Sequence, residues 1–286
     1  MDTYFYQMLW LKKIMLWINW LSLDVVLGAM AGMLFFSRLL HVSLDWKMDL
    51  LLGLSVWVIY TADHLLDSKG KAELDLSPRH QFHARNFKTL GAIVLLAMAF
   101  GLLGAIQILG WSQELYWSIG LTLLIAGSMV LIRWGGEKMN GWKELSTAIY
   151  YGLGVSWIPM LRAHALDLNW KYGLLVGLFV SLAFVNLLML SCLDREQDKQ
   201  AGFPSAALLL QPDKLTLKIR QLTIVLIVLS VLVLLLLPSF YRVFASLLLG
   251  MLLLHYVIFF DKRLEPEQVR RRTEAVFLLP WILVLV

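Results

Sequence analysis

The sequence predicts an all-α, polytopic membrane protein. Of its 286 residues, 59% are hydrophobic and only 16% are charged, which leaves too little polar surface to cover a water-soluble domain of this length. The apolar residues occur in blocks of about 20, the length that an α-helix needs to cross a hydrocarbon core about 30 Å thick. Basic residues are concentrated in alternate connections between these blocks, as is typical of helical membrane proteins.

Nine transmembrane helices account for the apolar blocks, and we expect one transmembrane helical domain over residues 1–286. The spans lie near 22–41, 48–66, 89–109, 115–133, 144–161, 171–192, 219–237, 241–260 and 273–286. The connections on one side are short, whereas two connections on the other side, 68–88 and 199–218, are long.

The distribution of basic residues predicts the orientation. Of the 25 Lys and Arg residues, 20 fall on the side of the N-terminus and five on the other. Cytoplasmic connections carry such an excess, so we expect a cytoplasmic N-terminus and an integral protein of the inner (cytoplasmic) membrane whose active site faces the cytoplasm. Because topology accounts for the basic residues, no basic patch remains for nucleic acid.

The first 20 residues, MDTYFYQMLWLKKIMLWINW, are amphipathic and place Lys12 and Lys13 among tryptophans. This composition predicts a helix that lies along the cytoplasmic surface of the membrane. The single cysteine, Cys192, excludes an intramolecular disulfide.

Two acidic pairs carry the functional interpretation. Asp63 and Asp67 end the second span, and Asp194 and Asp198 end the sixth. Residues four apart share a face of a helix, and charge at the membrane boundary is costly without a partner. Carboxylate oxygens suit Mg²⁺, which binds one or two of them together with substrate phosphates. The pairs therefore predict a Mg²⁺ site for a phosphorylated substrate, although a solvated helix end is the alternative for either pair alone.

Basic residues near the acidic pairs are candidates for gripping a diphosphate. They are Arg79, Lys138 or Arg133, Arg195 and Lys199. The alternative for each is a role in membrane orientation alone. His80 and His83 have helical spacing, but no third ligand accompanies them, so phosphate contact or interfacial packing is favoured over zinc.

At these residues the chain resembles the UbiA-type intramembrane prenyltransferase superfamily, whose members have nine transmembrane helices and two cytoplasmic Asp-rich motifs. Asp63 and Asp67 match the last two aspartates of the family's first motif, and Arg79 matches an arginine in the following loop. Asp194 and Asp198 match the second motif, which Gly202 and Pro204 follow. Asn186 stands where the family often has a polar residue facing the cavity.

The resemblance implies Mg²⁺-dependent prenyl transfer from an isoprenyl diphosphate to a lipophilic, for instance aromatic, acceptor at the membrane lipid. It implies that the four aspartates hold the metal and serve catalysis. The residues expected to bind substrate are Arg79, Lys138, Arg195, Lys199, Asn186 and Tyr60.

The chain departs from the family where the leading Asn and Asp of the first motif would stand, since Ile59 and Tyr60 occupy those positions. One metal ligand is therefore missing. Two alternatives stay open: a terpene cyclase on the same scaffold, and an inactive isoprenoid-binding protein. A transporter is disfavoured, because the charges cluster at helix ends and not at mid-membrane.

Overall fold

The computed structural model describes residues 16–69, 77–202 and 205–285, and helices make up the regular structure of these ranges. The predicted interfacial helix at 1–20 falls mostly outside them. The elements are α2 (Leu23–Leu39), α3 (Trp46–Ser68), α4 (Pro78–Arg85), α5 (Phe87–Leu109), α6 (Gln113–Gly135), η2 (Gly136–Met139), α7 (Trp142–Arg162), α8 (Trp170–Ala201), η3 (Ala206–Leu208), α9 (Pro212–Leu236), α10 (Ser239–Phe260), α11 (Pro266–Val276) and η4 (Leu279–Val284).

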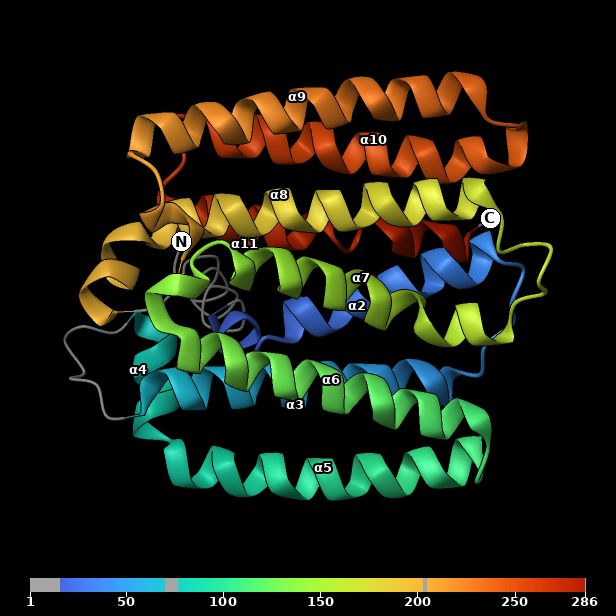
Figure 1. Ribbon diagram of the computed structural model, residues 1–286, viewed down its shortest axis with the longest axis horizontal. Helices are drawn as coiled ribbons and strands as arrows, with labels where there is room; N and C mark the ends of the chain where they lie inside the picture. Colours follow the sequence, from blue (N-terminus) through green and yellow to red (C-terminus); the bar gives the residue numbers. More distant parts are fainter. Residues whose placement is uncertain (1–15, 70–76, 203–204, 286) are drawn as a thin grey trace, which may run out of the picture.

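The long helices lie side by side and alternate in direction (Figure 1). One end of the bundle, at the left of Figure 1, carries the ends of α3, α6, α8 and α10 together with α4. We call it the charged end, because the acidic pairs and the long connections lie there. The chain ends at the opposite end, where the connections are short, as the sequence predicts.

Six helices are long and apolar enough to cross a membrane, namely α3, α5, α6, α8, α9 and α10. Their length and composition indicate an integral membrane protein, as the sequence predicts. The other three predicted spans correspond to α2, to α7 and to α11 with η4, which are not among these six helices. Nine membrane spans therefore stay a prediction.

The predicted ninth span, 273–286, is wrong as a continuous helix. The chain enters this region as α11, which ends at Val276, and continues after two turn residues as the 3₁₀-helix η4. Pro280 supplies the physical reason, since it has no backbone N–H and its ring clashes with the carbonyl group four residues earlier.

The core of the bundle surrounds α2. Phe35 and Phe36 of α2 are fully buried against Phe179 of α8, with ring centroids 5.8 and 5.1 Å away. Phe244 of α10 meets Phe35 edge-on at 5.2 Å. By contrast, α5 and α6 expose most of their apolar side chains, as expected for helices that face lipid.

Helices α7 and α8 approach closely at Gly152. A Cβ atom placed on Gly152 would lie 2.4 Å from Cγ2 of Val180, a distance that real Cβ atoms do not adopt. Small residues allow such approaches between membrane helices. This contact fixes α7, which carries one wall of the site, against α8, which carries the second acidic pair.

We expect Gly152→Ala to destabilise the protein by about 1–3 kcal/mol, because the added methyl group overpacks the contact and the β-branched Val180 cannot rotate freely away. Thermal unfolding of the purified protein in detergent checks this. Adding Val180→Ala should restore part of the loss. A double variant no more stable than Gly152→Ala alone would contradict this account of the contact.

Candidate functional site

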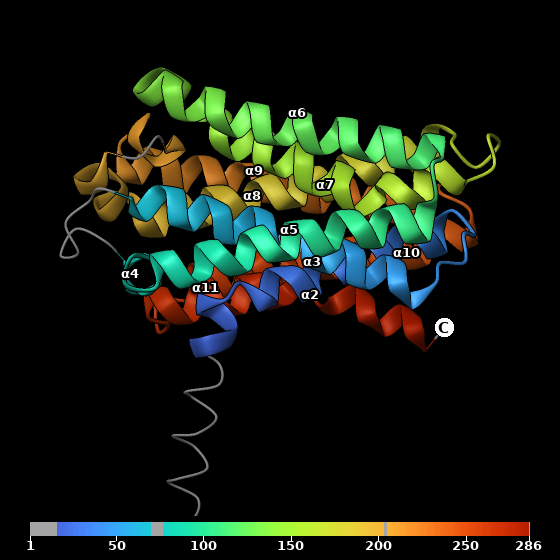
Figure 2. The ribbon, with the colours of Figure 1, turned by 90° about the horizontal axis from the view of Figure 1, so that it is seen from below.

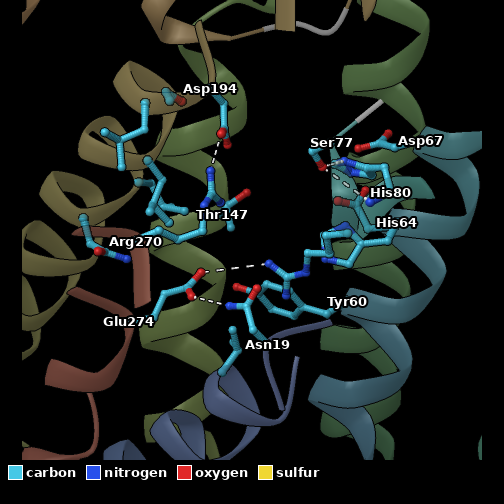
Figure 3. Close-up of a pocket in the computed structure, with 18 of the residues that line it drawn as sticks. Asn19, Tyr60, His64, Asp67, Ser77, His80, Thr147, Asp194, Arg270 and Glu274 are labelled. Atoms are coloured by element: carbon cyan, nitrogen blue, oxygen red, sulfur yellow. Dashed lines mark hydrogen bonds and ion pairs between the residues drawn. The ribbon is translucent and has the colours of Figure 1, made fainter. Parts of the chain in front are cut away.

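A cavity of about 330 Å³ opens at the charged end of the bundle, between α3, α4, α7, α8 and α11. Figure 3 shows acidic, basic and histidine side chains from separate helices facing it. Seven of the ten site residues predicted from the sequence line it: Tyr60, Asp63, Asp67, Arg79, Asn186, Asp194 and Asp198. The two acidic pairs therefore face one space, although about 130 residues separate them in the chain.

The first acidic pair is held by two basic side chains from neighbouring helices. Arg133, at the end of α6, donates to Asp67, and its Nη2 atom lies 3.5 Å from Oδ1 of Asp63. Lys143, at the start of α7, places Nζ 3.7 Å from Oδ2 of Asp67. Asp67 is buried, so these cations offset the cost of keeping its charge away from water.

The second acidic pair has its own basic partner. Arg270 of α11 donates to Asp194, and both side chains are partly buried. Figure 3 shows this contact on the wall of the cavity opposite Asp67. Asp198, one helical turn further along α8, also lines the cavity.

A polar network surrounds Glu274 on the wall of the cavity formed by α2, α4 and α11. Asn19 donates to Oε2 of Glu274 and to Oδ2 of Asp24, both at 2.9 Å. Arg79 donates to Oγ of Ser22 at 2.5 Å, and its Nη1 atom lies 3.9 Å from Oε1 of Glu274. Arg79 therefore lines the cavity while its guanidinium group connects α4 to α2 and α11.

Three histidines line or border the cavity beside the first acidic pair. The ring of His64 lies 5.1 Å from that of His80 and 5.0 Å from that of His83, measured between centroids. Burial lowers the pKa of His80 to about 4 and also lowers the pKa of His83. These two imidazoles are therefore neutral at neutral pH.

Asn186 is buried on α8, and its Oδ1 atom has no hydrogen-bond partner among the described residues. A buried, unpaired amide oxygen is costly, so this atom is available to a ligand in the cavity. Tyr60, the residue at the position of the missing family aspartate, also lines the cavity, and Figure 3 places it near the Glu274 network.

Three residues expected to bind substrate do not line the cavity: Lys138, Arg195 and Lys199. Arg195 donates to the backbone carbonyls of Ala207 and Leu210, so it holds the connection to α9. The helix explains this correction. Helix α8 continues to Ala201, and each residue of a helix is turned about 100° from the one before it. Arg195 and Lys199 directly follow Asp194 and Asp198, so they lie on a different face of α8 from the aspartates that line the cavity. Lys138 lies on η2, outside the cavity wall.

Six charged or histidine residues line the cavity without being predicted from the sequence: His64, Lys143, Glu144, Glu267, Arg270 and Glu274. Lys143 and Arg270 belong to connections whose basic residues the sequence explains by membrane orientation, and Glu274 falls at the start of the predicted span 273–286. His64 directly follows Asp63 in the sequence, so its position within the first acidic pair is the local feature that could have indicated it.

The acidic pairs fit Mg²⁺ that is completed by phosphate oxygens. Among the described residues, no three acidic, histidine or cysteine side chains stand close enough to cage a metal by themselves. Mg²⁺ does not need such a cage, since it is commonly bound by one or two carboxylates, water and substrate phosphates. Asp63 with Asp67, and Asp194 with Asp198, each supply two hard oxygen ligands on one helix face.

Comparison with known proteins identifies the fold. The chain superposes on the apo structure of a UbiA homologue from Aeropyrum pernix K1 with a TM-score of 0.60, at 13% sequence identity, over 92% of this chain and 98% of that one. The chain has a UbiA-like fold. No protein-family model and no curated protein matches the sequence. The UbiA-like fold agrees with the resemblance seen in the motifs.

Glu144 anchors the chain that follows α8. It is buried, and its Oε1 atom accepts hydrogen bonds from Ser191 Oγ and, at 2.8 Å, from the backbone N–H of Ala206. We expect Glu144→Ala to destabilise the protein by about 2–4 kcal/mol, because both donors lose their partner. Thermal unfolding in detergent measures this.

The matched control is Glu114→Ala, which removes the partly exposed ion pair between Glu114 and Arg162 at the other end of the bundle. This change should cost about 1 kcal/mol or less. Equal losses in the two variants would contradict the anchoring role of Glu144.

His80 predicts a pH dependence of stability. The unfolded histidine has a pKa of about 6.5, whereas the pKa of folded His80 is about 4. Between these values the unfolded chain binds more protons, so stability falls as the pH falls from about 6.5 toward 4. From pH 7.5 to pH 5, His80→Gln should lose about 2 kcal/mol less stability than the unchanged protein.

Chemical unfolding of both proteins at the two pH values measures the difference. His164→Gln changes an exposed histidine at the opposite end and should behave as the unchanged protein does. Identical pH dependence in all three proteins would contradict the burial of a neutral His80.

Proposed function

We propose that the protein transfers a prenyl group from an isoprenyl diphosphate to a lipophilic acceptor, with Mg²⁺, at the cytoplasmic face of the inner membrane. One observation carries the proposal: two acidic pairs from the ends of α3 and α8 line a single cavity in a UbiA-like bundle. The chemistry of these residues supports binding of a diphosphate.

The four aspartates would hold Mg²⁺, which would offset the negative charge of the diphosphate when bound. Lys143 and Arg270 line the same cavity and place fixed positive charge beside the pairs. Such preorganised charge favours a leaving group on which negative charge develops. Asn186, with its unpaired amide oxygen, is placed to orient a hydroxyl or other donor group of a ligand.

The proposed transfer breaks the bond between the allylic carbon and the diphosphate oxygen, and both electrons leave with the diphosphate. A carbon or heteroatom of the acceptor then forms a bond to the allylic carbon and releases a proton. Tyr60, Tyr151 and Phe277 line the cavity, and their rings offer faces that attract a cation. The apolar walls exclude water that would otherwise capture the allylic cation.

The first motif lacks one carboxylate, and we expect this to affect Mg²⁺ binding more than diphosphate binding. Tyr60 stands in its place, and Arg133 and Lys143 contact the remaining pair. We expect the first pair to bind Mg²⁺ more weakly than the second, because it competes with two cations for its carboxylates.

We expect Asp63→Asn and Asp194→Asn each to lower prenyl transfer by about 100-fold or more, since each removes charge that acts on the leaving group. The assay supplies labelled isoprenyl diphosphates, Mg²⁺ and a panel of aromatic and lipid acceptors to the purified protein. Asp49→Asn is the matched control, because Asp49 lies on α3 at the opposite end of the helix.

Each outcome decides between the alternatives. A product that forms without any acceptor supports a terpene cyclase, and Mg²⁺-dependent binding of a diphosphate analogue without turnover supports a binding protein. Unchanged transfer in both site variants would refute the proposed role of the acidic pairs.

A further inference from the structure

A second, larger cavity of about 870 Å³ runs along the bundle between α3, α5, α6 and α7. We call it the groove. Its walls are predominantly apolar side chains, and two of its helices, α5 and α6, expose most of their apolar side chains. α5 packs along α3 and α6 packs along α7, so the groove lies between two helix pairs. Figure 2 shows α6 on one flank of the bundle and α5 with α3 below it.

The groove and the charged cavity meet. Six residues line both: Tyr60, Asp63, Asp67, Lys143, Thr147 and Tyr151. Arg133 also lines the groove at this junction. A ligand that spans the junction would place an anionic group beside Arg133 and Lys143 and a continuous apolar chain in the groove. Asp63 and Asp67 pair with these two cations at the same junction, so the identity of the head group follows from the proposed function.

The length of the groove limits the length of the apolar ligand chain that it can hold. Along α7 it extends from Lys143 to Ile158, a rise of about 22 Å at 1.5 Å per residue. Met48 and Leu115, both buried, stand at its far end. An isoprene unit adds four carbon–carbon bonds of about 1.5 Å each, or roughly 5 Å when extended. The groove therefore accommodates about four isoprene units.

Gly154 stands along this path. It lines the groove, and a Cβ atom placed on it would meet no other atom within 4 Å. The nearby Gly152 differs, since it is packed against Val180 on another face of α7. Gly154 lies about 16 Å from Lys143 along the helix, the depth that the end of a third isoprene unit would reach. A large side chain at this position would fill the groove beyond that depth.

We propose that the groove binds the prenyl chain of an anionic phosphorylated isoprenoid of about four isoprene units, and that Gly154 keeps it open for the fourth unit. The inference rests on the proposed function for the identity of the head group. It goes further in naming the chain length and the residue that determines it.

The test measures equilibrium binding of farnesyl and geranylgeranyl diphosphates to the full-length protein in detergent, with Mg²⁺ and without acceptor. The unchanged protein should bind geranylgeranyl diphosphate at least about tenfold more tightly, because the fourth unit is buried. Gly154→Phe should remove that preference by weakening geranylgeranyl binding at least about tenfold, with farnesyl binding changed less than about threefold.

Gly127→Phe is the matched control. Gly127 lies exposed on α6 outside the groove lining, and an added Cβ there also meets nothing within 4 Å. Its affinities should equal those of the unchanged protein. Ser55→Phe is a second variant in case Gly154→Phe does not fold, since Ser55 lines the groove from α3. It should also weaken geranylgeranyl diphosphate binding more than it weakens farnesyl diphosphate binding.

Equal affinity for the two diphosphates in the unchanged protein would overturn the inference, as would equal weakening of both by Gly154→Phe. A phospholipid that co-purifies and is displaced by Gly154→Phe, without any length dependence for the diphosphates, would also overturn it. Length-dependent binding without prenyl transfer would refute the proposed function alone. Transfer without length dependence would refute this inference alone.

Discussion

The charged end of this bundle depends on the pairing of buried carboxylates with cations from neighbouring helices. Asp67 is buried at the end of a helix long and apolar enough to cross the membrane, where an uncompensated charge is expensive. Arg133 and Lys143 come from the two helices joined at this end, α6 and α7. These ion pairs therefore stabilise the fold locally. They also bring together the charged side chains beside which the proposed diphosphate and its metal would bind.

The bundle divides into a tightly packed part and a loosely packed part. Phe35, Phe36, Phe179 and Phe244 interlock around α2, and Gly152 draws α7 against α8. These contacts fix the second acidic pair and the wall of the cavity that carries Lys143. α5 and α6 lack comparable buried contacts, so a groove for a lipid chain can lie beside them. The cavity with the acidic pairs and the apolar groove thus lie in differently packed parts of one bundle.

The first acidic motif shows how the site differs from the family pattern. Tyr60 replaces a carboxylate and lines both the charged cavity and the groove. At this junction an aromatic ring adjoins the expected path of the allylic carbon, whereas a carboxylate would adjoin the metal. Relative to the pattern of the family that the chain resembles, Tyr60 offers an apolar face with a polar tip where a carboxylate would stand, next to the two cations that contact Asp63 and Asp67.

The sequence by itself determined the helical class, the two ends of the bundle and the four aspartates of the cavity. Apolar run length, charge asymmetry and the four-residue spacing of Asp63 with Asp67 and of Asp194 with Asp198 are local properties, so they can be read without neighbours. Only the tertiary structure decided which cations meet these pairs. Arg195 is adjacent to Asp194 in the chain but is turned away from the cavity by the helix, whereas the distant Arg270 reaches Asp194 because α11 packs beside α8. The groove at Gly154 likewise arises from the placement of α3, α5, α6 and α7, which no single-helix pattern encodes.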